Sequence, residues 1–218
     1  MSSLAAAIDS VVFDLDGTLW DTGAACARGW NNVLERHAIA FRTISADDVR
    51  SVAGQAHDAC IRQVFRGLPE RELAILIEET QEEDKRCVAA MGGELYDGVA
   101  DGLVRLSALL PLFIVSNCQA GYIETFLALQ RCAALFKDFE CWGNTGQSKP
   151  ENLRRVIERN RLRAPLFVGD TEGDRAAAQA CGVPFVHAAY GFGRCPEAAA
   201  HFETFPALMQ WLIAQCLK

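Results

Sequence analysis

The chain has 218 residues, half of them hydrophobic, which is enough for one large domain or for a domain with an insert. Its 28 acidic and 21 basic residues give a net charge of −7, which argues against nucleic acid or an anionic membrane surface as a partner. No apolar run approaches the roughly 20 residues of a membrane span, and residues 1–7 lack the basic segment of a signal peptide, so we expect a cytoplasmic protein.

The first predicted element is a buried strand over residues 10–13, followed at once by the sequence Asp-Leu-Asp-Gly-Thr. The two acids of this sequence, Asp14 and Asp16, are therefore expected where the backbone turns away from the strand. Two carboxylates in different surroundings can have different roles in a reaction, one as a nucleophile and the other as a proton carrier.

A long stretch without a strand pattern follows this motif. Its apolar spacing predicts helices over residues 22–37, 46–52, 55–65 and 69–91. The acidic run in the last of these helices, residues 78–84, is expected to form a solvated face. An insert of this size predicts a second, small, all-helical domain at residues 20–91.

Strands and helices alternate through the rest of the chain. Buried strands are predicted at residues 112–115, 166–168 and 184–186, with a weaker one at 139–142. Helices are predicted at residues 98–110, 119–129, 150–160, 173–181 and 205–217. This alternation predicts an α/β fold, a doubly wound, Rossmann-like parallel sheet built from residues 1–19 and 92–218.

The nine cysteines give no sign of a disulfide framework or a zinc site. Their number is odd, their spacing is irregular and none of them forms a C-x-x-C pair. We therefore expect reduced thiols in the core and at the surface.

Polar residues follow the predicted strands at their carboxyl ends, where ligands bind in open parallel sheets. Ser116 and Asn117 follow the second strand, where they could bind an oxyanion or simply make a turn and a helix cap. Asp170 and Asp174 follow a later strand. Together with Asp14 they would repel one another unless a divalent cation such as Mg²⁺ neutralised them. Asp174 could equally be a helix cap without any metal.

Lys149 precedes Pro150 at a predicted helix start. Lysine is a poor N-cap, and an added cation at a helix N-terminus is unfavourable. A residue that breaks a local rule is a candidate for function. In a functional role, Lys149 would direct a positive charge at Asp14 and at a substrate phosphate. The alternative is that Lys149 is an exposed lysine in a loop.

Together these residues resemble the haloacid dehalogenase (HAD) superfamily, whose members are mostly Mg²⁺-dependent phosphatases. The four motifs of that family occur in order, at residues 14–18, 115–117, 148–150 and 169–174. The helical insert between the first two resembles the family's small cap domain. Residues 49–54 resemble the phosphoglycolate phosphatase branch, whereas Cys118 stands where many relatives have Gly or Lys.

The resemblance implies hydrolysis of a small phosphomonoester through an aspartyl-phosphate intermediate. Asp14 would attack phosphorus, and Asp16 would protonate the leaving group and then activate water. Ser116, Asn117 and Lys149 would bind the phosphoryl group, and Lys149 would also restrain the nucleophile.

The resemblance also implies Mg²⁺ as the cofactor. Its ligands would be the carboxylates of Asp14 and Asp170 and the backbone carbonyl of Asp16, with Asp174 supporting them from outside. The implied partner is a small phosphorylated metabolite, and the protein would be a monomer or a homodimer. Candidates for substrate specificity in the cap are Arg50, Gln55 and His57, although His57 could also be a surface histidine.

Other activities within the superfamily fit the sequence less well. Dehalogenases and phosphonate hydrolases resemble this chain less, because they lack the second acid that Asp16 supplies. A phosphosugar mutase keeps both acids but often has a cap Gly-x-x-Arg where this chain has Gly-Gln-Ala-His at residues 54–57. A catalytically silent binding protein would be expected to have lost a motif residue, and none is missing.

Overall fold

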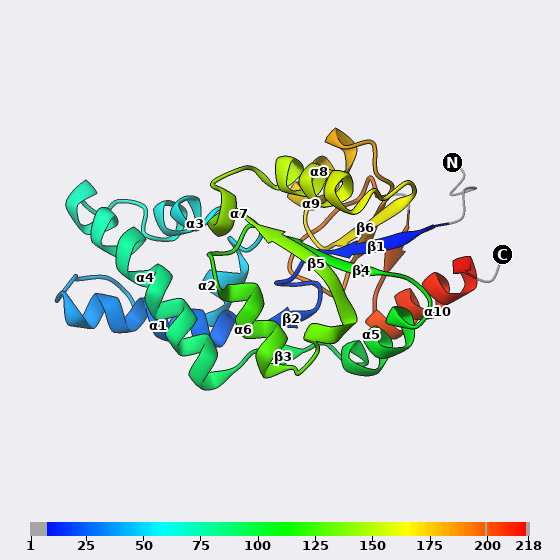
Figure 1. The fold of residues 1–218 in the computed structure, drawn as a ribbon. Helices are drawn as coiled ribbons and strands as arrows, with labels where there is room; N and C mark the ends of the chain where they lie inside the picture. Colours follow the sequence, from blue (N-terminus) through cyan, green and yellow to red (C-terminus); the bar gives the residue numbers. More distant parts are fainter. Residues whose placement is uncertain (1–7, 199, 217–218) are drawn as a thin grey trace.

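The computed structural model describes residues 8–198 and 200–216 (Figure 1). The prediction about a signal peptide at residues 1–7 and the end of the predicted last helix at residue 217 lie outside these residues. None of the helices in the described part combines the length and the apolar character that crossing a membrane requires.

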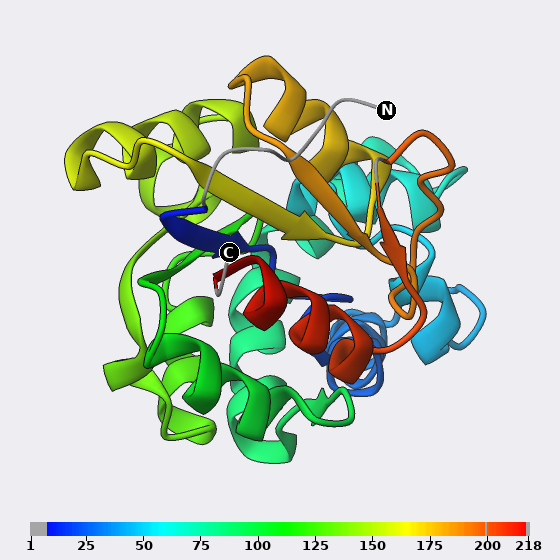
Figure 2. The ribbon, with the colours of Figure 1, turned by 90° about the vertical axis from the view of Figure 1, so that its right-hand side faces the viewer.

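A six-stranded sheet forms the centre of the fold, in the order β5-β4-β1-β6-β7-β8, and every neighbouring pair is parallel (Figure 2). The fold prediction is therefore confirmed. The strands are β1 (Ser10–Phe13), β4 (Leu112–Ser116), β5 (Phe136–Cys141), β6 (Pro165–Gly169), β7 (Phe185–Ala188) and β8 (His201–Phe202). The two-residue strand β8 is too short to give a periodic signal. The predicted strand at 139–142 begins earlier than expected, and Trp142 starts the short helix α7 (Trp142–Thr145).

Helices cover both faces of the sheet because the central strand is apolar on both sides. Val11 and Phe13 belong to the core shared with α5 (Val99–Ser107), α6 (Tyr122–Leu129) and α10 (Phe205–Cys216). Val12 belongs to the core on the opposite face, under α8 (Lys149–Asn160) and α9 (Glu172–Ala180). Since side chains alternate along a strand, consecutive residues of β1 anchor opposite layers.

The predicted helical insert is present and lies beyond the carboxyl end of β1 (Figure 1). Its helices are α1 (Gly23–Arg36), α2 (Ala46–Arg50), α3 (His57–Val64) and α4 (Glu70–Met91). They enclose an apolar cluster of their own, which includes Trp30, Phe65 and Leu76. The chain enters the insert through β2 (Trp20–Asp21) and leaves it through β3 (Glu94–Leu95), and these two strands pair antiparallel. This pairing brings the two ends of the insert together.

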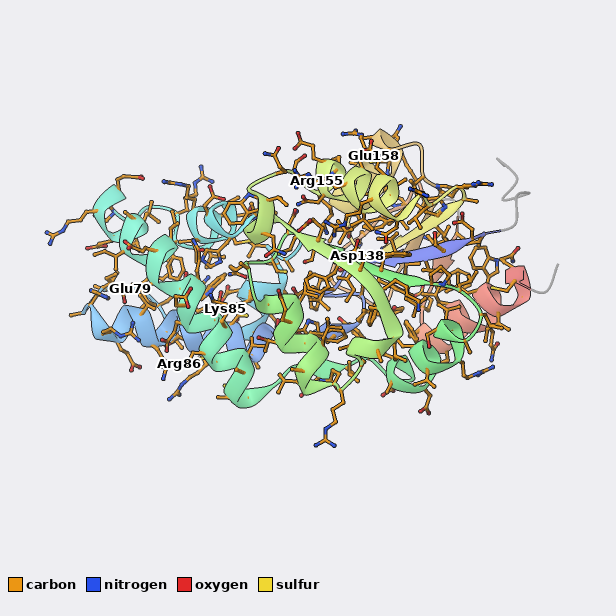
Figure 3. All side chains as sticks on the ribbon, in the orientation of Figure 1. Glu79, Lys85, Arg86, Asp138, Arg155 and Glu158 are labelled. Carbon is orange, nitrogen blue, oxygen red and sulfur yellow. The ribbon has the colours of Figure 1, made fainter. Side chains whose placement is uncertain are left out.

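The prediction of a solvated acidic face on α4 is wrong for two residues. Glu83 and Asp84 are only 5% and 3% exposed, whereas Glu79, Lys85 and Arg86 of the same helix remain nearer the surface (Figure 3). The reason is that α1 packs closely along α4 and buries a wider face than the apolar residues alone define. The described cysteines are all free, as expected.

Candidate active site

A cavity of about 90 Å³ lies between the carboxyl end of the sheet and the helical insert. It brings together residues from both parts of the chain, including most of those singled out from the sequence. They are Asp14, Asp16, Ser116 and Asn117 from the sheet side and Arg50, Gln55 and His57 from the insert. Lys149, Asp170 and Asp174 lie behind Asp14 and do not line this cavity.

The first motif is held at the end of β1 by backbone geometry. The N–H of Asp14 donates to the carbonyl of Val168 at 2.8 Å, which ties the motif to the neighbouring strand β6. The turn then passes through Gly17, whose φ of +85° favours glycine. A Cβ at this position would lie 2.3 Å from Oδ2 of Asp170, so glycine also allows the two motifs to approach each other.

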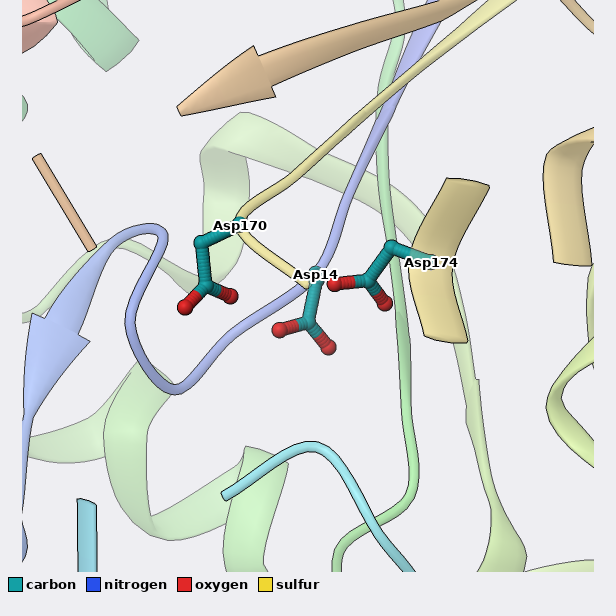
Figure 4. Close-up of side chains that lie close together, drawn as sticks. All are labelled: Asp14, Asp170 and Asp174. Atoms are coloured by element: carbon teal, nitrogen blue, oxygen red, sulfur yellow. The ribbon is translucent and has the colours of Figure 1, made fainter. Parts of the chain in front are cut away.

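Three buried acids converge at this edge of the sheet, Asp14, Asp170 and Asp174 (Figure 4). Each offers a carboxylate oxygen, and these atoms lie within 4.8 Å of one another. Burial, reinforced by the charge of Asp174, raises the pKa of Asp14 well above its usual range and that of Asp170 to about 7. Such a cluster is costly to ionise without a cation.

Lys149 supplies one positive charge to the cluster. Its Nζ donates to Oδ1 of Asp14 at 2.7 Å and to Oδ1 of Asp174 at 2.6 Å, and the side chain is 4% exposed. Burial opposes the charge, but the two aspartates outweigh it and raise the pKa of Lys149 above its usual value. Lys149 is the first residue of α8, one position inside the N-cap Ser148, so the alternative of an exposed loop lysine is wrong.

Asp174 combines the two roles that the sequence left open. It is the third residue of α9, and its Oδ2 accepts hydrogen bonds from the N–H and the hydroxyl of the N-cap Thr171. Its Oδ1 accepts from Lys149. Both oxygens therefore already have donors, which suits a supporting position better than direct contact with a metal.

Asp14 and Asp170 each have a carboxylate oxygen that could still bind a cation. Within the described part of the chain, Oδ2 of Asp14 accepts no hydrogen bond. Oδ2 of Asp170 accepts from the N–H groups of Phe192 and Gly193, while its Oδ1 has only a long contact of 3.4 Å with the hydroxyl of Thr18. Two facing carboxylate oxygens of this kind fit a hard divalent cation.

Asp16 has surroundings different from those of Asp14. Its Oδ1 accepts hydrogen bonds from the hydroxyls of Thr22 at 3.1 Å and Tyr122 at 2.9 Å. Burial raises its pKa to about 6, although these two hydroxyls oppose the shift. Neither partner could be found from the sequence, since neither belongs to one of the four motifs. A carboxyl that changes charge near neutral pH can both give and take a proton.

Ser116 and Asn117 differ in whether their side chains can still donate a hydrogen bond to a ligand. The hydroxyl of Ser116, at the buried end of β4, only accepts a hydrogen bond of 3.3 Å from the N–H of Cys118 and keeps its own proton available. The amide of Asn117 instead donates to the backbone carbonyl of Gly54 at 2.7 Å. Asn117 thus links the sheet to the helical insert.

The three residues singled out in the insert line the cavity, but their side chains already form hydrogen bonds or ion pairs with other residues. Arg50 binds both Asp21 and Asp47, at 2.7 and 2.6 Å. Gln55 donates to the side chain of another glutamine, Gln63. His57 is 6% exposed and hydrogen-bonded through both ring nitrogens, so the alternative of a surface histidine is wrong.

A doubly wound sheet that gathers three buried acids and a lysine at its carboxyl end defines an α/β enzyme. The family model described as haloacid dehalogenase-like hydrolase matches residues 11–188. The chain belongs to this family.

Relatives place the chain in one branch of the family. A protein of Rhodobacter capsulatus named phosphoglycolate phosphatase is 29% identical over 210 residues, covering 91% of this chain and 94% of its own. A protein of the same name from Shigella boydii is 30% identical, with 85% and 82% covered. These findings confirm the predicted family and the enzyme class, a phosphoric monoester hydrolase similar to phosphoglycolate phosphatases.

Solved structures show the same fold. A haloacid dehalogenase-like hydrolase of Streptococcus pneumoniae superimposes with a TM-score of 0.82 at 16% identity, covering 94% of this chain and 98% of its own. The HAD-hydrolase YfnB of Bacillus subtilis, solved with bound magnesium, has a TM-score of 0.72 at 20% identity, with 95% and 100% covered.

Proposed function

We propose that this protein is a Mg²⁺-dependent phosphatase that hydrolyses a small phosphomonoester through a phosphorylated Asp14. The observation that carries the proposal is the arrangement around Asp14. One of its oxygens is held by Lys149, the other has no partner within the described residues, and Asp16 lines the same cavity. A restrained nucleophile beside a carboxyl of raised pKa is the pairing that phosphoryl transfer to a carboxylate requires.

The acids present fit the metal that the family implies. Asp14 and Asp170 would hold Mg²⁺ together with the backbone carbonyl of Asp16, while Asp174 would support them through Lys149. When bound, the metal would neutralise the carboxylates and the phosphate dianion, which otherwise repel one another.

The reaction would proceed in two displacements. Asp14 attacks phosphorus, the bond from phosphorus to the ester oxygen breaks, and Asp16 gives its proton to that oxygen. Water then attacks the acyl phosphate as Asp16 takes back a proton, and inorganic phosphate leaves with Asp14 restored. Ser116 and Lys149 would hold the phosphoryl oxygens during both steps.

We also propose that residues 20–91 act as a cap domain over a catalytic core of residues 1–19 and 92–218. The apolar cluster of the insert and the link from Asn117 to Gly54 support this division. The small cavity favours a small leaving group. Because the curated relatives are named phosphoglycolate phosphatases, phosphoglycolate is the first substrate to test.

The role of Asp16 can be tested with Asp16→Ala. Loss of a general acid should reduce kcat by roughly 10²–10⁴-fold for an alkyl phosphate, whose leaving group needs a proton. The first step should suffer much less with p-nitrophenyl phosphate, since p-nitrophenolate leaves without protonation. The measurement is the burst of p-nitrophenolate in a rapid-mixing experiment beside the steady-state rates. Equal, small losses with both substrates would remove Asp16 from this role.

A further inference from the structure

The cavity continues past the catalytic acids to a polar cluster formed by Trp30, His57, Asp84 and Gln119, all of which line it. Their side chains come from α1, α3, α4 and the segment before α6, and each residue is less than 9% exposed. The mechanism uses none of them. They lie where a leaving group could extend from a phosphate held at Asp14.

The N–H groups of this polar cluster already donate hydrogen bonds to other members of the cluster and to neighbouring residues. Nε2 of His57 lies 2.8 Å from the hydroxyl of Thr80, which itself donates to a backbone carbonyl. Nε2 of Gln119 approaches Nδ1 of His57 at 2.8 Å and Oδ2 of Asp84 at 3.5 Å. The indole N–H of Trp30 donates to the same Oδ2 at 3.2 Å. This pattern fixes a neutral His57 that has no N–H left for a ligand.

One acceptor in the cluster is left over. Oδ1 of Asp84 is buried and has no hydrogen-bond partner among the described residues. A buried polar atom of this kind costs free energy unless a partner is supplied. Burial, reinforced by the charge of Asp16, raises the pKa of Asp84 well above its usual range. Nδ1 of His57 lies 3.7 Å from Oδ2 of Asp84, but burial lowers the pKa of His57 to about 4, so the neutral imidazole supplies no counter-charge.

The charged residues of the cavity wall also favour a cationic group over an anionic one. Among the described lining residues Arg50 is the only lysine or arginine, and two aspartates already bind its guanidinium. A carboxylate on the leaving group would therefore meet Asp84 and no free cation. An ammonium group would meet an acid without a counter-charge, and the indole of Trp30 in the same wall could attract it further.

We infer that Asp84 selects the leaving group, and that the preferred substrate is a small phosphomonoester of an amino alcohol whose ammonium group binds Asp84. This inference rests on the proposed phosphatase function and names its substrate class. Asp84 also binds Trp30 and so joins α1 to α4. A purely structural role would not make the enzyme distinguish between substrates that differ only in the group at the far end.

The test is a series of two-carbon phosphate esters given to the full-length protein with Mg²⁺. The members are 2-aminoethyl phosphate, 2-hydroxyethyl phosphate, ethyl phosphate and phosphoglycolate, compared by kcat/KM. We expect 2-aminoethyl phosphate to exceed ethyl phosphate by roughly 10-fold or more, the effect of one hydrogen bond to a charged group. Phosphoglycolate should fall below ethyl phosphate.

Asp84→Asn should lower the ratio of kcat/KM for 2-aminoethyl phosphate to that for ethyl phosphate by about 10-fold. The ratio cancels any general loss of active protein. Asp58→Asn, which removes an exposed carboxylate from α3, is the matched control and should keep the wild-type ratio. A wild-type preference for phosphoglycolate, or an unchanged ratio in Asp84→Asn, would overturn the inference even with p-nitrophenyl phosphate hydrolysed normally. Failure to hydrolyse any ester would instead overturn the proposed function.

Discussion

Asp14→Asn is expected to reduce the hydrolysis of p-nitrophenyl phosphate by roughly 10⁴-fold or more, as removal of a nucleophile does in other enzymes. The substitution keeps the size of the side chain and an oxygen that can accept from Lys149. What it removes is the negative charge and the oxygen that would attack phosphorus. Because p-nitrophenolate leaves without being protonated, a loss of activity with this substrate cannot result from the loss of a proton donor.

The measurement is the initial rate at saturating Mg²⁺, with thermal unfolding to show that the variant is folded. Asp101→Asn, at an exposed position of α5, is the matched control and should hydrolyse the ester at the wild-type rate. An Asp14→Asn protein that retained a tenth of the activity, as a rough threshold, would exclude Asp14 as the nucleophile.

Removal of divalent metal is the second change with a large expected effect. Excess chelator should abolish hydrolysis, and added Mg²⁺ should restore it. The three buried acids have carboxylate oxygens within 4.8 Å of one another, and among the described residues only Lys149 forms an ion pair with them. Full activity in chelator would contradict the metal site.

Binding can be checked without activity. A ligand that binds only the folded protein raises its melting temperature, so Mg²⁺ should stabilise the wild type. Asp170→Asn should lose most of this stabilisation, whereas Asp138→Asn, at the third residue of the edge strand β5 and outside the acid cluster, should keep it. Equal stabilisation of both variants would place the metal elsewhere.

Much of the core and its site could be predicted because the signals are local. The run before Asp14 is apolar on both faces, so it can only be a central strand, and the acids that follow must lie at its carboxyl end. The same holds for Ser116, the last residue of β4, and for Asp170, which directly follows β6. Parallel pairing then brings these strand ends together without any further information.

Arg50, Gln55 and His57 of the helical insert line the cavity, but the contacts that the insert makes there could not be predicted, because they depend on packing between helices. Asp84 lies in an acidic run whose composition is that of a solvated surface, and it is buried by the approach of α1 together with His57 and Gln119. Tyr122 reaches Asp16 from a helix more than a hundred positions further along the chain, and no motif marks it. For the same reason the sequence left open whether His57 is a specificity residue or a surface histidine, since its partners Thr80 and Gln119 come from distant segments.

Phosphorylation of Asp14 can be tested most directly by trapping the phosphorylated protein in the variant Asp16→Asn. This variant can still release p-nitrophenolate from p-nitrophenyl phosphate, but it should activate water poorly, so the phosphorylated form should accumulate. Acid quenching followed by borohydride reduction converts an acyl phosphate to an alcohol, and peptide mass spectrometry locates it. We expect homoserine at position 14 when substrate and Mg²⁺ are both present, and unmodified aspartate without substrate. Release of p-nitrophenolate with Asp14 unmodified, or modification at another acid, would contradict the phosphorylation of Asp14.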